Sequence, residues 1–300
     1  MKILILGVGG RLGAALVREY RAKYDVAGFD HSQLDLGNLD DVRAKLRDRN
    51  FGVLINAAAF TNVDACETER DRAFLINAEA PGILAEICNE KDARLIHFST
   101  DYVFDGEKRG PYTEEDPANP ISAYGESKLA GEKCVLAAGD GHLVVRVSWV
   151  FGPDRPSFVD AMIKRAQQDE KIDAISDKFS TPTYTRDIAH MLPQFFDRGG
   201  PGGILHFANA GKCTWQEYAQ WALDCCCDAG IPLKGRTVGT LKLSDMTRLR
   251  QGSGGQAPWV ARRPVYSVLS TAKYAELTGT PSRAWREAVA DYITRFYAPR

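Results

Sequence analysis

Residues 2–13, KILILGVGGRLG, decide the fold class of this 300-residue chain. The run from Lys2 to Leu6 is apolar after its first residue, as expected for a parallel strand buried on both faces. A turn with Gly7, Gly10 and Gly13 follows it and leads into AALVREYRAKY, which has helical periodicity. Glycines in this spacing allow a tight turn and let the backbone approach a pyrophosphate at the helix N-terminus. The stretch therefore predicts a dinucleotide-binding strand, turn and helix.

Short apolar runs and helical patterns alternate through the rest of the chain. Strands are expected at 26–29, 52–56, 94–99, 142–148 and 204–207, and helices at 39–48, 70–91, 157–169, 185–198, 214–230 and 283–297. This alternation predicts an α/β fold, with a Rossmann-like doubly wound parallel sheet of six or seven strands and a smaller interleaved C-terminal substrate domain. We expect a dinucleotide-binding domain over 1–152, with returning segments around 173–207, and a mainly substrate-binding region over 153–300. The Gly-rich loop 251–258 is a candidate lid.

Residues at the ends of the first strands are candidates for the cofactor site. Asp30 ends the second strand, where an acidic residue commonly accepts hydrogen bonds from the adenosine ribose. A carboxylate there favours NADH because it repels a 2′-phosphate, but Arg11 and His31 would offset that repulsion, so the preference stays open. Asp35 would reach the adenine edge. Small residues that let a cofactor lie close to the backbone follow the third strand, namely Ala57, Ala58 and Ala59.

A second group of candidate residues surrounds the fourth strand. Thr100 directly follows the β-rich run 94–99, so it is expected at the carboxyl edge of the sheet, where ligands bind. Tyr124 and Lys128 are four residues apart among good helix formers, which places both side chains on one helix face. An ammonium beside a phenol should lower the pKa of the tyrosine from its ordinary value of about 10. We therefore expect Tyr124 to protonate a carbonyl group, with Thr100 as a second hydrogen-bond donor.

Two further residues each have two interpretations. Trp149 follows the strand expected at 142–148, and it either packs on a sugar or pyrimidine face or belongs to the hydrophobic core. Asn77 lies within the helix expected at 70–91 and is either a buried polar anchor or a residue that faces a turn. The sequence alone does not separate these alternatives.

The composition argues against several classes of protein. A net charge of −1 gives no electrostatic basis for binding nucleic acid or an acidic membrane surface. The seven cysteines lack disulfide-framework spacing and the five histidines lack metal-ligand spacing, so we expect free thiols and no metal site. The chain begins directly with the first strand, and no apolar run approaches the ~20 residues of a membrane span. We expect a cytoplasmic protein.

Six segments in order resemble the extended short-chain dehydrogenase/reductase family over nearly the whole chain. They are NAAAFTNVDACE (56–67), STDYVFDG (99–106), YGESKLAGEK (124–133), RVSWVFG (146–152), FSTPTYTRDIA (179–189) and ARRPVYSVLSTAKY (261–274). The resemblance implies an oxidoreductase that reduces the C4 ketone of dTDP-4-dehydro-L-rhamnose to dTDP-L-rhamnose with hydride from NADPH or NADH. It is compatible with a homodimer. Some family members hold magnesium at a dimer interface, but no residue pattern here predicts that ion.

The resemblance also implies roles for individual residues. Thr100, Tyr124 and Lys128 would form the catalytic triad, and the last two would also contact the cofactor. Other cofactor residues would be Gly7, Gly10, Arg11, Leu12 and Gly13 at the pyrophosphate, Asp30, Asp35 and Leu36 around the adenosine, and Ala57, Ala58, Ala59, Phe60 and Thr61 along the channel. Substrate residues would be Thr100, Asp101, Tyr102 and Trp149 at the sugar, with Arg262 or Arg263 at the diphosphate.

Two competing functions stay open. A 4,6-dehydratase or 4-epimerase of the same fold retains tightly bound NAD, and a dehydratase usually carries Asp-Glu after its threonine. Here Asp101 is followed by Tyr102, which argues against elimination chemistry. The other competitor is a non-catalytic binding subunit similar to the regulatory subunit of methionine adenosyltransferase. The intact set of Thr100, Tyr124 and Lys128 argues against that loss of catalysis.

Overall fold

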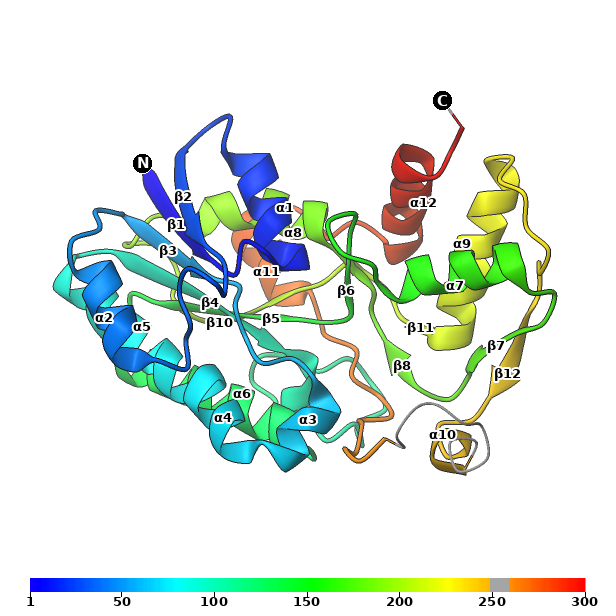
Figure 1. The fold of residues 1–300 in the computed structure, drawn as a ribbon, viewed down its shortest axis with the longest axis horizontal. Helices are drawn as coiled ribbons and strands as arrows, with labels where there is room; N and C mark the ends of the chain where they lie inside the picture. Colours follow the sequence, from blue (N-terminus) through cyan, green and yellow to red (C-terminus); the bar gives the residue numbers. More distant parts are fainter. Residues whose placement is uncertain (249–258, 300) are drawn as a thin grey trace.

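The computed structural model describes residues 1–248 and 259–299, and a parallel sheet of six strands forms the centre of this described part (Figure 1). The strands lie in the order β10-β5-β4-β3-β1-β2, which confirms the predicted doubly wound sheet. The chain places β2 on one side of β1 and then β3 on the other side, so the order in which strands are added reverses between β1 and β3. Ligands bind at such a switch point. The candidate lid at 251–258 lies outside the described residues. The strands are β1 (Lys2–Leu6), β2 (Asp25–Phe29), β3 (Val53–Asn56), β4 (Arg94–Thr100), β5 (Leu143–Val147) and β10 (Gly203–Phe207).

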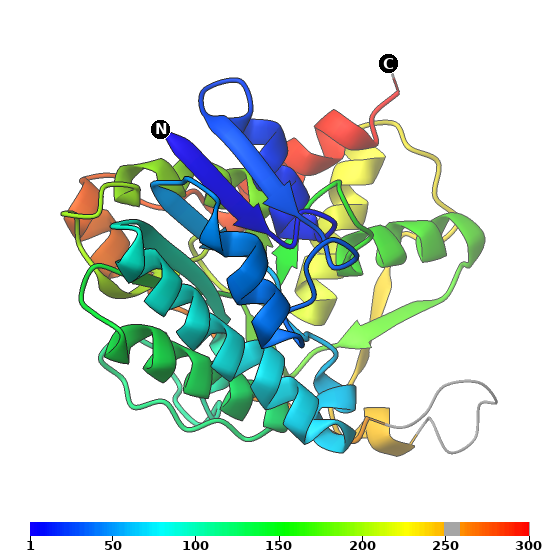
Figure 2. The ribbon, with the colours of Figure 1, turned by 60° about the vertical axis from the view of Figure 1, so that its left-hand side comes forward.

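Alternate side chains of β1 enter two separate hydrophobic cores, as expected for a strand covered on both faces. Ile3 and Ile5 pack with α1, α8 and α11 on one face. Leu4 and Leu6 pack with α2, α5 and α6 on the other, and Figure 2 shows these three helices lying across that face. The helices are α1 (Arg11–Tyr20), α2 (Leu39–Arg47), α5 (Ala80–Glu90), α6 (Ala123–Ala137), α8 (Thr185–Met191) and α11 (Ala272–Thr278).

A third core, rich in aromatic residues, lies in the region at the right of Figure 1. Its main helices are α7, α9 and α12. Helix α9 begins at a capping box, in which Glu217 N donates to Thr214 Oγ1 (3.1 Å) and Thr214 N donates to Glu217 Oε2 (2.7 Å). The elements of this region are β6 (Val150–Phe151), α7 (Phe158–Gln168), β7 (Ile172–Ile175), β8 (Phe179–Ser180), β9 (Thr183–Tyr184), β11 (Cys213–Thr214), α9 (Trp215–Asp228), β12 (Val238–Leu241), α10 (Asp245–Arg248) and α12 (Trp285–Phe296).

The helix expected at 70–91 runs over residues 70–90 and contains a π-helical turn. After α3 (Val63–Thr68), the chain forms α4 (Arg70–Phe74), a π-helical turn at Leu75–Glu79, and then α5. Asn77 lies in that turn and is buried. Its Oδ1 accepts from Phe60 N (2.8 Å), and its Nδ2 donates to Phe60 O (3.0 Å) and to Ser127 Oγ (3.0 Å). Asn77 is therefore the buried polar anchor, and it ties the segment after β3 to α6.

Three global features complete the description. None of the helices in the described ranges is long and apolar enough to cross a bilayer. The same ranges contain no group of three or more histidine, cysteine, aspartate or glutamate side chains arranged to hold a metal ion. All seven cysteines are free thiols, as expected.

Candidate functional site

The turn between β1 and α1 depends on its glycines. Gly7 has a φ of +81°, and its N–H donates to Phe29 O (2.8 Å). A Cβ on Gly13 would lie 2.2 Å from the Gly7 carbonyl oxygen, so only glycine lets α1 pack this close to the turn. Helix α1 begins after Gly10 without a side-chain cap. Its first backbone N–H groups and its dipole are therefore free to bind an anion.

The close packing at Gly13 predicts that Gly13→Ala destabilises the protein. In an open helix interior the same change would stabilise by about 1 kcal/mol. Here the new methyl group overlaps the Gly7 oxygen, so α1 or the turn must move. We expect the free energy of unfolding to fall by about 1–3 kcal/mol in urea denaturation.

Gly110→Ala is the matched control for this substitution, because a Cβ on Gly110 meets no atom within 4 Å. We expect it to change the free energy of unfolding by less than about 0.5 kcal/mol. Equal effects at Gly13 and Gly110 would contradict the packing argument.

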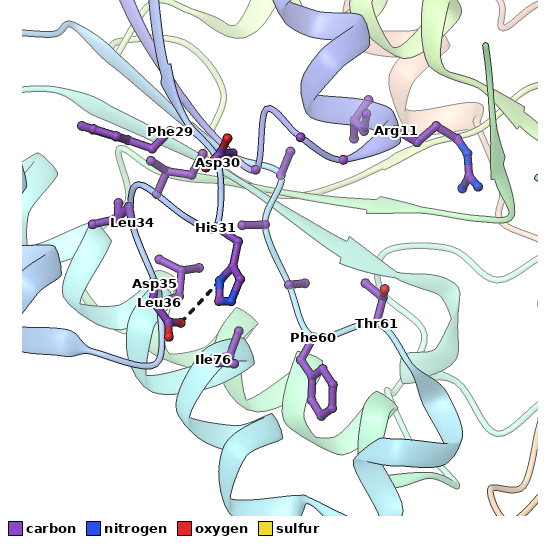
Figure 3. A pocket seen from close by; sticks show the side chains of 18 of the residues that line it. Arg11, Phe29, Asp30, His31, Leu34, Asp35, Leu36, Phe60, Thr61 and Ile76 are labelled. Atoms are coloured by element: carbon purple, nitrogen blue, oxygen red, sulfur yellow. Dashed lines mark ion pairs between the residues drawn. The ribbon is translucent and has the colours of Figure 1, made fainter. Parts of the chain in front are cut away.

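A cleft of about 760 Å³ lies beside this turn, at the carboxyl ends of β1, β2 and β3 (Figure 3). Its volume falls within the range of small-molecule and cofactor sites. Most of the residues expected at the cofactor line it: Gly7, Gly10, Arg11, Leu12, Asp30, Asp35, Leu36, Ala57, Ala58, Ala59, Phe60 and Thr61. Gly13, Tyr124 and Lys128 are not among its lining residues.

Arg72 and Arg155 also line the cleft, and the sequence contains no signal for either. The Arg155 Nε donates to Gly9 O (2.9 Å), across 146 residues of sequence. The Arg72 guanidinium lies over the Phe60 ring, 5.0 Å from its centroid. Guanidinium groups are well suited to phosphate oxygens. Arg155 therefore adds positive charge to the cleft, whereas Arg72 is paired with Glu69, its Nη1 lying 2.8 Å from Glu69 Oε2.

The side chain of Arg11 extends away from Asp30 and the adenosine end of the cleft, as Figure 3 shows. Its guanidinium donates to the carbonyl oxygens of Val150 (3.1 Å), Arg155 (3.1 Å) and Pro156 (2.5 Å). Burial lowers its pKa. Arg11 thus ties the start of α1 to the segment after β5. The hypothesis that its charge offsets the carboxylate of Asp30 is therefore wrong.

Two carboxylates lie at the other end of the cleft. Asp30 Oδ1 accepts from Ser32 Oγ (2.6 Å), Ser32 N (2.9 Å) and Gln33 N (3.1 Å). The hydrogen bond from the Ser32 side chain is the main cause that lowers the pKa of Asp30. Asp35 pairs with His31 at 3.6 Å, the dashed line in Figure 3. Asp30 is therefore ionised at neutral pH, and His31 faces Asp35.

Tyr124 and Thr100 meet where β4 ends and α6 begins. Ser122 caps α6, its Oγ accepting from Gly125 N (3.3 Å). The Thr100 side chain lies close enough to the Tyr124 phenol to oppose the rise of its pKa. Its ring lies edge-to-face against Tyr102, with centroids 5.8 Å apart. The two hydroxyl groups expected to act together on a carbonyl are therefore adjacent.

Tyr124 also adjoins the wall of the cleft. Its ring packs against a small buried cluster of Cys66, Ala73 and Ala123, and the ring of Phe60, a cleft residue, packs against the same cluster. The geometry therefore links the Tyr124 side chain to the cleft through shared packing.

The amine of Lys128 is directed toward β4. Its Nζ donates to Phe98 O (2.7 Å) and lies 3.2 Å from His97 Nε2. Burial lowers the pKa of Lys128 to about 8, and burial also raises the pKa of Tyr124 well above its ordinary value. The prediction that Lys128 lowers the pKa of Tyr124 is wrong in this structure. Desolvation of the phenol outweighs the opposing effect of the Thr100 side chain, and the lysine has other partners.

Asp101, which is expected to contact the sugar, is buried. Ser148 Oγ donates to its Oδ2 (3.0 Å), and Thr100 Oγ1 donates to its Oδ1 (3.1 Å). Burial raises the pKa of Asp101, although the nearby Lys178 opposes that rise. Lys178 also lies over the Tyr102 ring, 5.2 Å from its centroid. Asp101 thus holds Thr100 in place from the side of the protein interior.

Trp149 packs at the edge of the aromatic core. Its ring is 5.1 Å from that of Phe158, 5.2 Å from Trp215 and 4.8 Å from Tyr218. It nevertheless stays only partly buried at the edge of the aromatic core. Its φ of +44° is uncommon for a residue with a Cβ, and such strained backbone occurs often at functional sites.

Arg263 already has a carboxylate partner. Its Nη2 lies 2.7 Å from Asp64 Oδ2 and its Nη1 lies 3.2 Å from Asp64 Oδ1, while the guanidinium stacks on Trp259 at 3.8 Å. Asp64 also accepts from Ala261 N (3.0 Å). Arg263 is therefore paired with Asp64, whereas Arg262 is exposed.

Comparisons with known proteins agree with this geometry. A family model described as the RmlD substrate binding domain matches residues 1–298. A dTDP-4-dehydrorhamnose reductase of Mycolicibacterium smegmatis is 40% identical over 295 residues, which cover 97% of this chain and 85% of that protein. The crystal structure of a dTDP-4-dehydrorhamnose reductase from Clostridium acetobutylicum superposes with a TM-score of 0.88 at 34% identity, covering 98% of this chain and 99% of that one. A dTDP-4-dehydrorhamnose reductase from Bacillus anthracis, solved in complex with NADP, gives a TM-score of 0.86 at 29% identity, with the same coverage of 98% and 99%.

Proposed function

The chain belongs to the family of the RmlD substrate binding domain, and on that premise we propose that it is an NAD(P)H-dependent oxidoreductase of dTDP-rhamnose biosynthesis. It reduces the C4 ketone of dTDP-4-dehydro-L-rhamnose to dTDP-L-rhamnose. The observation that carries this proposal is the pair of hydroxyl groups of Thr100 and Tyr124 beside a cleft that ends at the open N-terminus of α1. We expect the dinucleotide to bind the domain 1–152 with its returning segments around 173–207, and the sugar nucleotide to bind mainly the region 153–300.

Two features of the chain would bind a dinucleotide. The uncapped N-terminus of α1 would bind the pyrophosphate, and the small residues at 57–59 would let the cofactor lie close to the backbone along the cleft. When bound, the reduced nicotinamide supplies the hydride. Thr100 and Tyr124 donate hydrogen bonds to the C4 carbonyl oxygen, and Tyr124 transfers its proton to that oxygen. The raised pKa of Tyr124 keeps the phenol protonated at neutral pH, as a proton donor requires. Lys128 stabilises the phenolate that forms and holds the nicotinamide ribose.

The direct test is an absorbance assay of NADPH or NADH oxidation with dTDP-4-dehydro-L-rhamnose. We expect oxidation that depends on this substrate and is absent with dTDP-glucose, which has no C4 ketone. Purified protein that carries stoichiometric NAD and turns over without external cofactor would instead indicate a dehydratase or epimerase. A protein that binds the cofactor but oxidises none with any 4-keto sugar nucleotide would indicate a binding subunit.

The carboxylate of Asp30 predicts the direction of a cofactor-specificity change. A 2′-phosphate on the adenosine ribose would face this ionised group, and Arg11 is turned away from it. We expect Asp30→Ala to raise kcat/KM for NADPH relative to NADH at least severalfold, because a like-charge contact is removed. Asp40→Ala, at an exposed position in the first turn of α2, should leave that ratio unchanged. An unchanged ratio in Asp30→Ala would place the ribose elsewhere.

The assembly and the location of the protein are further proposals. We expect a homodimer, which light scattering after size-exclusion chromatography measures, and a cytoplasmic location, which cell fractionation measures.

A further inference from the structure

A buried chain of hydrogen bonds connects the wall of the cleft to Lys128. Ala58 N donates to Asn56 Oδ1 (3.1 Å), Asn56 Nδ2 lies 3.1 Å from His97 Nδ1, and His97 Nε2 lies 3.2 Å from Lys128 Nζ. The three side chains come from β3, β4 and α6 and are 0%, 0% and 2% exposed. Ala58 lines the cleft.

The hydrogen bond from Ala58 N determines which atoms donate and which accept in the rest of this series of hydrogen bonds. The backbone N–H of Ala58 can only donate, so the Asn56 atom that faces it is the oxygen, and the amide NH₂ faces His97. His97 Nδ1 therefore accepts. Because a neutral imidazole carries one proton, that proton is on Nε2 and points at the amine of Lys128.

We propose that His97, with its tautomer fixed by Asn56, is a positioning residue that holds the Lys128 side chain on β4 in the cofactor-free protein whenever the Lys128 amine is neutral. The His97 N–H then donates to the lone pair of a neutral Lys128 amine, while that amine donates to Phe98 O. An ammonium group at the same place would face an N–H donor, which is unfavourable. Protonated Lys128 therefore leaves His97, and it is free to turn toward Tyr124, one helical turn away.

The surroundings of His97 and Lys128 set the protonation states that this hydrogen bond requires. Burial is the main cause that lowers the pKa of Lys128 to about 8, so the neutral amine that accepts from His97 predominates above about pH 8. Burial also keeps His97 neutral by lowering its pKa well below the ordinary value. On α6, the group that opposes this effect is Glu132, which raises the pKa of Lys128. Its carboxylate is already bonded to Arg146 of β5. Tyr124, also on α6, stays protonated because burial raises its pKa.

The inference rests on the proposed function for the role of Lys128, but the state of His97 and Lys128 can be measured without turnover. In the cofactor-free wild-type protein, ¹⁵N NMR of His97 is expected to show a proton on Nε2 and none on Nδ1 at neutral pH, with the signals assigned by their loss in His97→Gln. A proton on Nδ1, or a doubly protonated ring, would overturn the proposal. This measurement needs no variant that might fold poorly.

A second experiment reverses the direction of the hydrogen bond between residue 56 and His97. In Asn56→Asp one carboxylate oxygen still accepts from Ala58 N, while the other can only accept from His97. The imidazole proton should move to Nδ1, and the pKa of Lys128, followed by ¹³C NMR of its Cε, should rise toward the ordinary value of about 10.4. Asn62→Asp is the matched control, since Asn62 makes the same kind of bond to Ala65 N (3.0 Å) at the exposed start of α3.

The outcomes separate this inference from the proposed function. A rise in the pKa of Lys128 without the tautomer change would contradict the proposal, because the added charge alone would explain it. The same holds if Asn62→Asp changes His97 and Lys128 to the same extent. If both NMR results are as expected but 4-keto sugar nucleotides are not reduced, the proposed function fails and the positioning role stands.

Discussion

Tyr124→Phe is expected to lower kcat for reduction of the sugar ketone by about 10²–10⁴-fold, the range typical for loss of a general acid. The substitution removes one oxygen and keeps the ring, which packs edge-to-face against Tyr102. The cofactor should still bind, because the cleft is lined by other residues. Steady-state kinetics with dTDP-4-dehydro-L-rhamnose measure the first effect, and a fluorescence titration with NADH measures the second.

A tyrosine remote from the cleft provides the control. Tyr24 packs against Tyr20 and Phe196, and Tyr24→Phe should leave kcat within a factor of about two, since it lies outside the catalytic group. Near wild-type turnover in Tyr124→Phe would remove this residue from the mechanism. Loss of cofactor binding together with activity would indicate a structural role instead.

Glu132→Ala is expected to cost about 3–5 kcal/mol of unfolding free energy, because it leaves the buried charge of Arg146 without a partner. The Glu132 carboxylate accepts from Arg146 Nε (2.9 Å) and Nη2 (2.6 Å), and from Ser99 Oγ (2.5 Å). The side chains of Arg146 and Glu132 are 3% and 1% exposed. Guanidinium chloride denaturation measures the loss.

Two further variants define what that result means. Glu86→Ala breaks the ion pair between Glu86 and Arg43, whose side chains are 56% and 43% exposed, respectively. It should cost no more than about 1 kcal/mol of unfolding free energy. The double substitution of Glu132→Leu with Arg146→Met should recover most of the stability, because it removes both buried charges. A loss below about 1 kcal/mol in Glu132→Ala would show that Arg146 finds other partners or water.

The strands and the Gly-rich turn were predictable because their cause is local. A buried parallel strand needs an apolar run, and the turn after β1 needs glycine where a Cβ would meet backbone. The helix expected at 70–91 forms over residues 70–90, but the π-helical turn within it was not predicted. There a tertiary contact decides the structure, since Asn77 bonds to Phe60 and Ser127 from within a π-helical turn.

The candidate site was predictable to the extent that strand ends bring residues together. Thr100 and Tyr124 are adjacent, and the residues after β1, β2 and β3 line one cleft. Partners far apart in sequence were not predictable, as the bonds of Arg11 to Val150 and the contact of Arg155 with Gly9 illustrate. Helical spacing alone does not show how deeply a side chain is buried or which other acceptors form hydrogen bonds with it.

Lys128 shows the same limit at the centre of the site. Its spacing from Tyr124 places both residues on α6, but its hydrogen bonds go to Phe98 and His97 of β4. Burial then sets the pKa values of both side chains. The proton-donor role of Tyr124 is consistent with this arrangement, since a raised pKa keeps its proton in place until the ketone is reduced.

Isotope transfer tests the central claim most directly. With NADPH or NADH that carries two deuterium atoms at C4 of the nicotinamide and dTDP-4-dehydro-L-rhamnose as substrate, we expect deuterium at C4 of the sugar in dTDP-L-rhamnose, detected by NMR and mass spectrometry of the product. A product without deuterium, or with deuterium at another sugar carbon, would contradict direct hydride transfer to the carbonyl that Thr100 and Tyr124 hold.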